Sequence, residues 1–169
     1  MVIIMSNYVC KIATLEDMEI KWNYEIEHAD DKDNWIIWKE KAMKCREYGA
    51  QIPYYGVLDK QIISEATASL TPDIVQNGED LVDDETAYLT AFRTIPEYQG
   101  KGYFSKLFKF MIKDLKKRGY KRVTIGVEPT ELKNKEIYAK YGFTNKIKEG
   151  IETYPDGTEV EVEYYSKNI

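Results

Sequence analysis

The feature that most constrains the fold of this chain is a strand, a turn with two glycines and an amphipathic helix, which follow one another without interruption. Residues 88–95 are rich in the β-branched and aromatic residues typical of strands. Gly100 and Gly102 form the turn, and residues 104–118 have the period of a helix that ends before Gly119. The apolar face of that helix consists of Phe104, Leu107, Phe108, Met111 and Leu115. The segment therefore predicts a strand joined by a glycine turn to a helix that packs on a sheet.

The glycine turn has the features of an anion-binding site. Glycine adopts backbone conformations that are closed to other residues. The first N–H groups of the following helix have no partner within the helix, and the positive end of its dipole favours a phosphate. Two nucleotide motifs do not fit. The chain lacks the Gly-Lys-Ser/Thr of the Walker loop, and Ser105 stands where the dinucleotide fingerprint needs a glycine. A phosphate site and a purely structural turn both remain open.

Residues 95–104, with the sequence IPEYQGKGYF, resemble motif A of the GNAT acyltransferase superfamily, whose pattern is Q/R-x-x-G-x-G/A. Gln99 and Gly102 match the pattern, and the glycine and lysine between them agree with its surroundings. Phe104 departs from it, because the motif has a small residue at this position. The Phe104 ring either docks in the core or narrows the space beside a bound phosphate.

A second segment makes the resemblance more specific. Tyr138, followed by Gly142 and Phe143, is similar to the Y-x-x-x-G-F segment of the same superfamily, and it stands at the usual distance after motif A. With the strand expected at residues 122–127, the resemblance covers about residues 85–145. It implies a mixed central sheet flanked by helices.

The remaining segments are compatible with that fold. Thr14 and Asp17 have the spacing of a capping box at the start of a helix, and residues 154–157, Tyr-Pro-Asp-Gly, have the composition of a hairpin turn. The expected strands are residues 8–13, 52–58, 61–70, 88–95, 122–127, 145–153 and 160–165. The resulting order is strand, two helices, three strands, helix, strand, helix, two strands. We expect an α/β (α+β) fold in one domain, residues 1–169.

The resemblance implies that acetyl-CoA is the acetyl donor and that no metal takes part. The N–H groups of the glycine turn would hold the pyrophosphate, and the Lys101 side chain would add positive charge. The backbone of Thr94 and Ile95 would pair with the amides of the pantetheine arm, between the strands at 88–95 and 122–127. The residues expected to contact the cofactor are Thr94, Ile95, Gln99, Gly100, Lys101, Gly102, Tyr103, Phe104 and Asn134.

Asn134 has two interpretations. It lies four residues before Tyr138, on the same helical face, so its amide either bonds the pantetheine arm or caps the helix. Many superfamily members carry an asparagine seven residues before the tyrosine, where this chain has Glu131. Tyr138 itself would donate a proton to the departing thiolate, because a phenol is a proton donor at neutral pH.

The base that deprotonates the amine is not evident from the residues. Members that acetylate histones carry a glutamate on the motif-A strand, at the place of Tyr88 in this chain. Glu65 on the preceding strand is the substitute that we assign to catalysis, with Glu85 and His28 as alternatives. Loss of the proton to solvent, without a dedicated base, also remains open.

The acceptor is expected to be a primary amine of a small molecule or peptide. The elements that border the acceptor site in the superfamily contain Trp22, Tyr24, Trp35, Tyr54, Tyr55 and Tyr154, and aromatic residues with acidic neighbours suit a cationic amine. We interpret the helical stripe of Trp35, Trp38, Ala42 and Cys45 as core-facing. The alternative function is a catalytically inactive CoA-binding module that regulates or binds a partner.

Charge and cysteine content limit the partners. The net charge of −5 argues against a nucleic-acid or membrane partner, and it leaves a homodimer open. Cys10 and Cys45 lack metal or redox spacing and are expected to be buried thiols in a reducing compartment. The apolar residues 1–5 are too short for a membrane span and lack a signal peptide's basic start. We expect a cytoplasmic enzyme.

Overall fold

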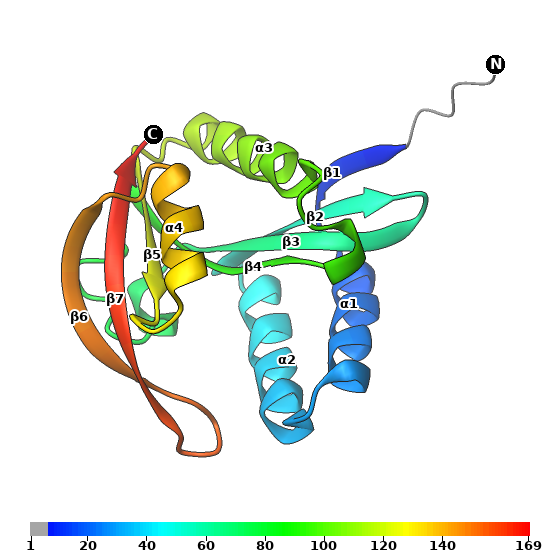
Figure 1. The fold of residues 1–169 in the computed structure, drawn as a ribbon, viewed down its shortest axis with the longest axis horizontal. Helices are drawn as coiled ribbons and strands as arrows, with labels where there is room; N and C mark the ends of the chain where they lie inside the picture. Colours follow the sequence, from blue (N-terminus) through cyan, green and yellow to red (C-terminus); the bar gives the residue numbers. More distant parts are fainter. Residues whose placement is uncertain (1–6) are drawn as a thin grey trace.

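The computed structural model describes residues 7–169, so the apolar segment 1–5 lies outside the described residues (Figure 1). The strands are β1 (Tyr8–Ile12), β2 (Gln51–Leu58), β3 (Gln61–Ser69), β4 (Thr86–Thr94), β5 (Arg122–Val127), β6 (Asn145–Thr153) and β7 (Glu159–Asn168). The α-helices are α1 (Leu15–His28), α2 (Lys32–Glu47), α3 (Tyr103–Lys117) and α4 (Leu132–Lys140). Two short 3₁₀ turns, η1 (Pro72–Ile74) and η2 (Pro96–Tyr98), were not expected. The expected order of strands and α-helices is confirmed.

The strands form one seven-stranded sheet in the order β1-β2-β3-β4-β5-β7-β6. Every neighbouring pair is antiparallel except β4 and β5, which are parallel. The mixed central sheet is therefore confirmed. A parallel pair needs a crossover connection, and α3 provides it between β4 and β5.

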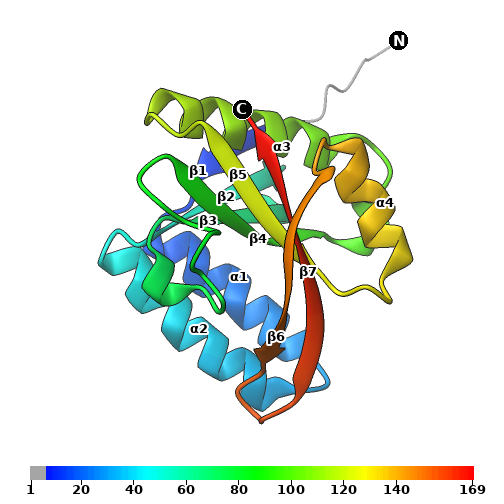
Figure 2. The ribbon, with the colours of Figure 1, turned by 90° about the vertical axis from the view of Figure 1, so that its left-hand side faces the viewer.

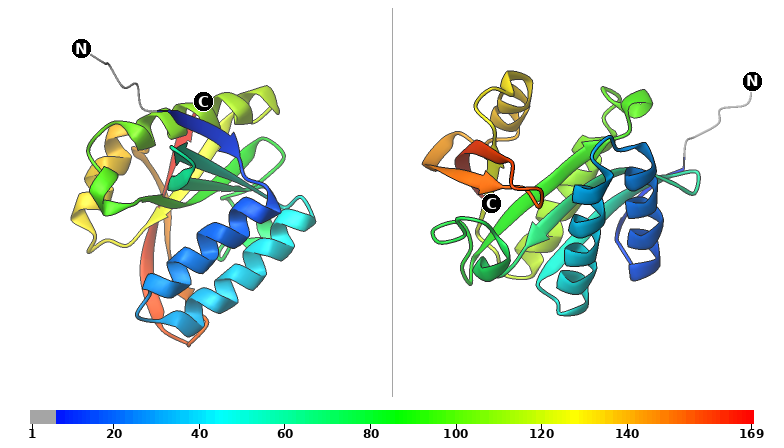
Figure 3. Two further views of the ribbon diagram at one scale, coloured as in Figure 1. Left: turned by 90° about the vertical axis from the view of Figure 1, so that its right-hand side faces the viewer. Right: turned by 90° about the horizontal axis from the view of Figure 1, so that it is seen from below.

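The helices cover both faces of the sheet. Figures 1 and 3 show α1 and α2 together against one face and α3 on the opposite face. The fully buried side chains of Leu107, Met111 and Leu115 on α3 belong to a core cluster with Leu89 of β4 and other strand residues. Burial of each such side chain stabilises the fold by about 1.5–3 kcal/mol. The apolar face is therefore the feature of α3 that the sequence predicts best. α4 packs on the same cluster through its own aromatic residues and lies beside α3 (Figure 2).

The start of α1 and the turn between β6 and β7 have the local geometry that the sequence predicts. The Thr14 hydroxyl accepts a hydrogen bond from the Asp17 N–H at 3.1 Å, and the Asp17 carboxylate accepts one from the Thr14 N–H at 2.9 Å. The capping box at the start of α1 is therefore confirmed. The β6–β7 hairpin turns at Gly157, which has φ +89°.

The parallel strands β4 and β5 pair over only part of their length. Cα partners run from Thr86 with Arg122 to Leu89 with Ile125, and β4 continues beyond Leu89 without a partner on that side. Ala91 has φ +58°, and the pairing of β3 with β4 shifts its register at the same level. This bulge bends β4 away from β5, so the two strands part as the resemblance implied.

The two cysteines differ in burial. Cys45 is buried, as expected, but Cys10 on β1 is only half-buried. β1 lies at one edge of the sheet, so among the described strands it has a neighbour, β2, on one side only. The expectation of two buried thiols was thus wrong for Cys10.

Candidate active site

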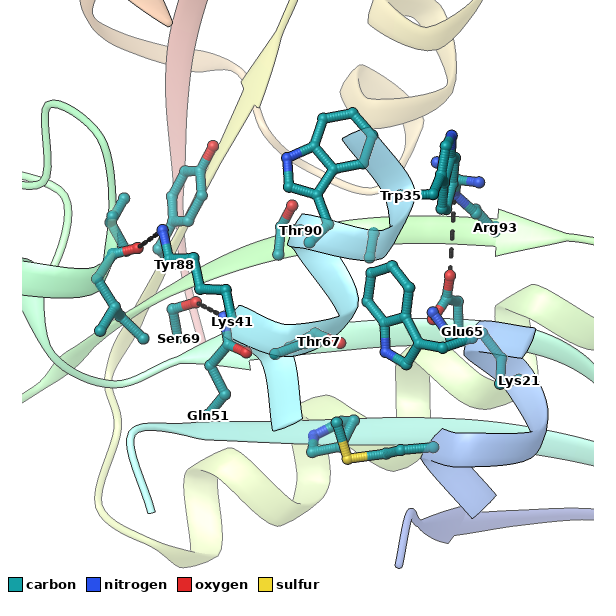
Figure 4. Close-up of a pocket in the computed structure, with 18 of the residues that line it drawn as sticks. Lys21, Trp35, Lys41, Gln51, Glu65, Thr67, Ser69, Tyr88, Thr90 and Arg93 are labelled. Carbon is teal, nitrogen blue, oxygen red and sulfur yellow. Dashed lines mark hydrogen bonds and ion pairs between the residues drawn. The ribbon is translucent and has the colours of Figure 1, made fainter. Parts of the chain in front are cut away.

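A cavity of about 330 Å³ lies between the sheet and the helices α1 and α2 (Figure 4). Strands β2, β3 and β4 form its floor, and the η1 turn and the end of β6 close it at the side. The residues of β4 that face it are Tyr88, Thr90, Ala91 and Arg93. These include the bulge, so the cavity reaches the point where β4 leaves β5.

The glycine turn has the conformation that an anion site needs. Gly100 and Gly102 have φ values of +74° and +85°, and a Cβ atom at either would meet no described atom within 4 Å. Gly102 is the N-cap of α3, and no side chain of residues 7–169 caps this helix. The first N–H groups of α3 therefore have no side-chain partner and are free to bind an anion.

Phe104 docks in the core. Its ring centroid lies 4.9 Å from that of Phe92 on β4 and 5.8 Å from that of Tyr141. Tyr103 beside it packs on Tyr8 at 4.8 Å, and the Tyr103 carbonyl accepts a hydrogen bond from the Tyr8 hydroxyl. Of the two interpretations of Phe104, the structure thus supports the one in which the ring packs inward.

Hydrogen bonds within the chain already engage Thr94, Ile95 and Gln99 of the expected cofactor residues. The Ile95 N–H donates to the Ile63 carbonyl at 2.8 Å, so it is not free to bind a pantetheine amide. The Gln99 side chain donates to the Thr94 carbonyl at 3.0 Å and closes the turn onto β4. Because residues alternate along a strand, the backbone of Thr94 points away from β3, toward the parting of β4 and β5. The exposed Lys101 ammonium lies 5.9 Å from the centre of the Tyr98 ring.

Tyr138 on α4 lies beside the parting strands. Its ring meets that of Phe92 edge-on, with 5.7 Å between the centroids, and Phe92 also contacts Phe104 at the start of α3. Tyr138 and the glycine turn are thus on the same face of the sheet, opposite the cavity. Burial raises the pKa of the Tyr138 phenol above its usual value, so it stays protonated at neutral pH.

Asn134 does not cap α4. The N-cap is Glu131, and no side chain in the described part of the chain makes a capping hydrogen bond there. The Asn134 amide instead donates to the Glu131 carboxylate at 2.7 Å. The capping interpretation is therefore wrong, and a contact of Asn134 with the cofactor stays a prediction.

Glu65 forms the floor of the cavity within a cluster of charges (Figure 4). Its Oε2 atom lies 2.7 Å from the Lys21 ammonium, and both side chains are buried. Its Oε1 atom lies 3.8 Å from Nε of Arg93 and has no hydrogen-bond partner among the described residues. Arg93 also pairs with Glu25 at 3.2 Å and stacks over the ring of Trp35. Glu65 is thus held in an ion-pair network.

The two tryptophans of α2 are not core residues. Trp35 and Trp38 are half-buried and line the cavity, as Ala42 does, whereas Cys45 is buried. Their rings lie 5.4 Å apart, and the ring of Tyr154 on the β6–β7 turn lies 5.4 Å beyond Trp38. The interpretation as a core-facing stripe was wrong for Trp35 and Trp38. Helical period gives the apolar face, but it does not show whether that face meets a core or an open cavity.

Other candidates lie away from the cavity. Tyr54 is on the opposite face of the sheet, where its hydroxyl donates to Asp114 of α3 at 2.6 Å. Tyr24 and His28 stack on each other at the exposed end of α1, with 4.1 Å between their rings. Glu85 pairs with Lys121 at the surface. None of these residues lines the cavity, so His28 and Glu85 are poorly placed to act as the base.

Sequence reasoning missed one of the two glutamates of the cavity. Glu152 on β6 lines the cavity, and its carboxylate accepts a hydrogen bond from the Tyr164 hydroxyl at 2.7 Å. β6 alternates between exposed and half-buried residues, and this alternation places Glu152 on the inner side. The period-2 pattern of residues 145–153 was a usable signal, but nothing in it distinguishes a glutamate in a cavity from one on the surface.

No group of three or more His, Cys, Asp and Glu side chains in residues 7–169 is arranged to hold a metal ion. No helix in that part of the chain combines the length and the apolar character that a bilayer span requires.

Comparison with known proteins gives one family. The sequence model of the acetyltransferase (GNAT) family matches residues 12–143. No curated protein sequence matches the chain. This match extends over most of the chain, whereas the two motifs cover only short segments of it.

Several solved structures share the fold. Ribosomal-protein-S18-alanine N-acetyltransferase from Escherichia coli is 18% identical, with a TM-score of 0.70 over 96% of this chain and 94% of the other. An N-acetyltransferase from Staphylococcus aureus Mu50 is 15% identical, with a TM-score of 0.66 over 96% and 99%. The yncA protein from Salmonella typhimurium, solved with its cofactor acetyl-CoA, is 16% identical, with a TM-score of 0.64 over 96% and 94%. The fold and the family match agree, and the chain therefore belongs to the acetyltransferase (GNAT) family.

Proposed function

We propose that this protein transfers an acetyl group from acetyl-CoA directly to a primary amine that enters the cavity beside α1 and α2. The observation that carries the proposal is the position of β4 beyond Leu89. On one face its residues Thr90, Ala91 and Arg93 line the cavity, and on the other Phe92 contacts Tyr138 and the start of α3. An acetyl group held where β4 parts from β5 can thus meet an amine from the opposite face.

The glycine turn and β4 would hold the donor. The N–H groups at Gly100–Phe104 would bind the pyrophosphate, because they have no side-chain cap and their helix dipole favours an anion. The Thr94 N–H would pair with the pantetheine arm, since the Thr94 carbonyl is engaged by Gln99, and Asn134 would bond the same arm from α4. Ile95 would contribute through its side chain and carbonyl, since its N–H is engaged by Ile63.

Direct transfer is supported by the state of the two cysteines. Burial raises the pKa of the Cys10 thiol, and burial also raises the pKa of the Cys45 thiol. A thiol with a raised pKa carries little thiolate at neutral pH and is a poor nucleophile. Neither cysteine lines the cavity. We therefore propose that the amine attacks the thioester itself and that the Tyr138 phenol protonates the departing sulfur.

The cavity favours an amine with a second polar group. The Tyr55 hydroxyl and Glu65 Oε1 are both buried at the cavity floor without a hydrogen-bond partner among residues 7–169. An unpaired buried polar atom costs about 1–3 kcal/mol, which a donor group of the acceptor or an ordered water would recover. The aromatic wall suits an apolar or cationic body. We propose an acceptor that is a small molecule or the end of a peptide.

The proposal is tested first by the donor and then by the reaction. Calorimetric titration with acetyl-CoA should show selective one-to-one binding, with an adenine nucleotide of the same phosphate content as the control. CoA release should then be monitored with 2-phenylethylamine, spermidine and an alanyl peptide as acceptors. Turnover of at least one amine supports the enzyme. Binding without any turnover would instead support a CoA-binding module, and no binding would refute both.

A further inference from the structure

We infer that Glu152 is the catalytic base, the group that takes the proton from the acceptor's ammonium form. The inference rests on the proposed function, because it assigns a role in that same transfer. Glu152 lies on β6, a strand outside the two motifs that carry the family resemblance, and its side chain lines the cavity together with Tyr88 and Tyr154. This places a carboxylate beside β4, on the face where the amine enters.

The strand that forms this end of the cavity offers no base of its own. Tyr88 of β4 faces the cavity, and its hydroxyl lies 2.8 Å from the place that a Cβ atom of Gly126 would occupy. The phenol thus fills the space beside β5 in which a side chain at position 126 would stand. Burial raises the pKa of the Tyr88 phenol well above its usual value, so it remains protonated and cannot accept a proton.

The Glu65 carboxylate is less suited to this role than Glu152. The Lys21 ammonium holds Oε2 of Glu65 at 2.7 Å, and Arg93 flanks Oε1. Both oxygens of this carboxylate thus already face a cation of the chain. Glu152 has no ion pair within 4.0 Å among the described residues, so its carboxylate is the cavity's freer proton acceptor.

A chain of hydrogen bonds orients the Glu152 carboxylate. The Asn77 amide donates to the Tyr164 hydroxyl at 3.0 Å, and this hydroxyl donates to Oε2 of Glu152 at 2.7 Å. Gly150 makes room for Asn77, since a Cβ atom there would lie 2.9 Å from the amide nitrogen. One oxygen is thereby fixed, and within residues 7–169 no hydrogen bond engages Oε1. Tyr164 is a positioning residue.

The surroundings favour a base that works near neutral pH. Burial raises the pKa of the Glu152 carboxyl, whereas the Tyr164 hydrogen bond and the Lys41 ammonium of α2 oppose that rise. Glu128, after β5, is a like charge nearby. The phenols of Tyr88 and Tyr154 also face it, and both stay neutral because burial raises their pKa values. A carboxylate with a raised pKa is a more effective general base at neutral pH than an ordinary one.

The protons and electrons of the step balance. The ammonium gives one proton to Glu152, and the neutral nitrogen then forms a bond to the carbonyl carbon of the thioester. The C–S bond breaks, its electron pair stays on sulfur, and sulfur takes the proton of the Tyr138 phenol. The second proton of the nitrogen returns to that phenol, and the first passes from Glu152 to solvent. One proton is released for each amide formed.

The test compares Glu152→Gln with Glu161→Gln, an exposed glutamate of β7 that does not line the cavity. We expect E152Q to lower kcat/KM for 2-phenylethylamine by about 100-fold, as loss of a general base does. The acid limb set by the Glu152 carboxyl should be replaced by one set by the amine, so the rate of E152Q should keep rising with pH until the amine itself has lost its proton. Acetyl-CoA affinity and Tm should stay near those of the wild type, and E161Q should match the wild type throughout.

A second acceptor and a second variant separate the role from a structural one. Phenylhydrazine is largely neutral at pH 7 and needs no base, so the E152Q defect should shrink for it. Tyr164→Phe removes one hydrogen bond from the carboxylate and should move the acid limb to higher pH, and this variant decides the matter if E152Q does not fold. If E152Q kept the acid limb and the kcat/KM of the wild type, the role of Glu152 as base would be overturned and the proposed function would stand. A wild-type protein that acetylates no amine would overturn the proposed function, and the inference with it.

Discussion

The ammonium group of Lys21 on α1 lies 2.7 Å from Oε2 of Glu65 on β3, with exposed side-chain fractions of only 6% and 4%. The pair connects the first helix to the sheet directly beneath the cavity. The pair stabilises the fold only while both members are present, because a buried charge without its partner raises the free energy of the folded state. The position of α1, and with it one wall of the cavity, depends on this contact.

Lys21→Met should therefore destabilise the fold. The variant leaves the Glu65 charge buried without its ammonium partner, and we expect the free energy of unfolding to fall by about 3–5 kcal/mol. Urea denaturation followed by circular dichroism measures this directly. Lys140→Met is the matched control: its pair with Glu136 has both side chains more than 70% exposed, so the change should stay within about 1 kcal/mol. Equal midpoints for wild type and K21M would contradict the expectation.

Gly102→Ala should weaken acetyl-CoA binding more than it weakens the fold. The left-handed φ of +85° costs alanine about 1–2 kcal/mol, although a Cβ atom there would meet no atom of residues 7–169 within 4 Å. The added methyl group would stand beside the N–H groups that bind the pyrophosphate, and we expect at least a tenfold rise in Kd by calorimetry.

Gly157→Ala provides the control for backbone strain. Gly157 has φ +89° and equally open surroundings, but it lies in the β6–β7 turn. Its alanine variant should lose similar stability and keep the wild-type Kd. If both variants bound acetyl-CoA as tightly as the wild type, the turn would have no role in binding the donor.

Tyr138→Phe should lower kcat while leaving the acetyl-CoA Kd within about twofold of the wild-type value. The variant keeps the ring that packs edge-on against Phe92 and removes only the proton donor, and general acids contribute about 100-fold or more. Steady-state kinetics and calorimetry on one preparation separate the two effects. Tyr120→Phe, a half-buried tyrosine after α3, should change neither quantity. Unchanged turnover in Y138F would remove the phenol from the mechanism.

Glu163 should make stability depend on acid pH. Hydrogen bonds from the Tyr165 hydroxyl and the Lys135 ammonium lower the pKa of the Glu163 carboxyl from 4.5 to about 2. Because the folded pKa is below the unfolded one, the unfolded state binds the proton first as pH falls. The stabilising contribution is therefore complete above about pH 4.5 and is lost as the pH falls toward about 2.

The Glu163→Gln variant checks this dependence. At pH 7 its Tm should lie below that of the wild type, and the difference should shrink steadily between about pH 4.5 and pH 2. Tm measured across this range for the wild type, E163Q and the exposed-site variant E161Q gives the comparison. A gap that stayed constant over the whole range would show that the carboxylate is not linked to folding in this way.

Much of the fold could be predicted because the signals are local. The apolar period of α3 identified Leu107, Met111 and Leu115 as core, and the Thr14–Asp17 capping box marked the start of α1. Each of these depends on residues within one or two turns, where propensity and hydrogen bonding act directly. The glycines at 100 and 102 are likewise required by their positive φ. The order of the elements followed from the sequence pattern, and the family resemblance implied the mixed central sheet flanked by helices.

The candidate site could be predicted only in part. The cavity joins Trp35 of α2, Glu65 of β3 and Glu152 of β6, which are far apart in the sequence. Whether Trp35 meets a core or an open cavity depends on how α2 sits on the sheet, and helical period carries no information on that. The one-domain assignment, the homodimer and the cytoplasmic location remain predictions.

The sequence by itself determined the helices, the strands, their order and the position of the glycine turn, because short-range backbone preferences and periodic burial decide these. Only the tertiary structure decided which polar groups face one another. The pairing of Lys21 with Glu65 and the orientation of Glu152 by Tyr164 arise from packing between distant elements. Charges and hydrogen bonds act over a few ångströms in space whatever their separation along the chain, and the site follows from that packing.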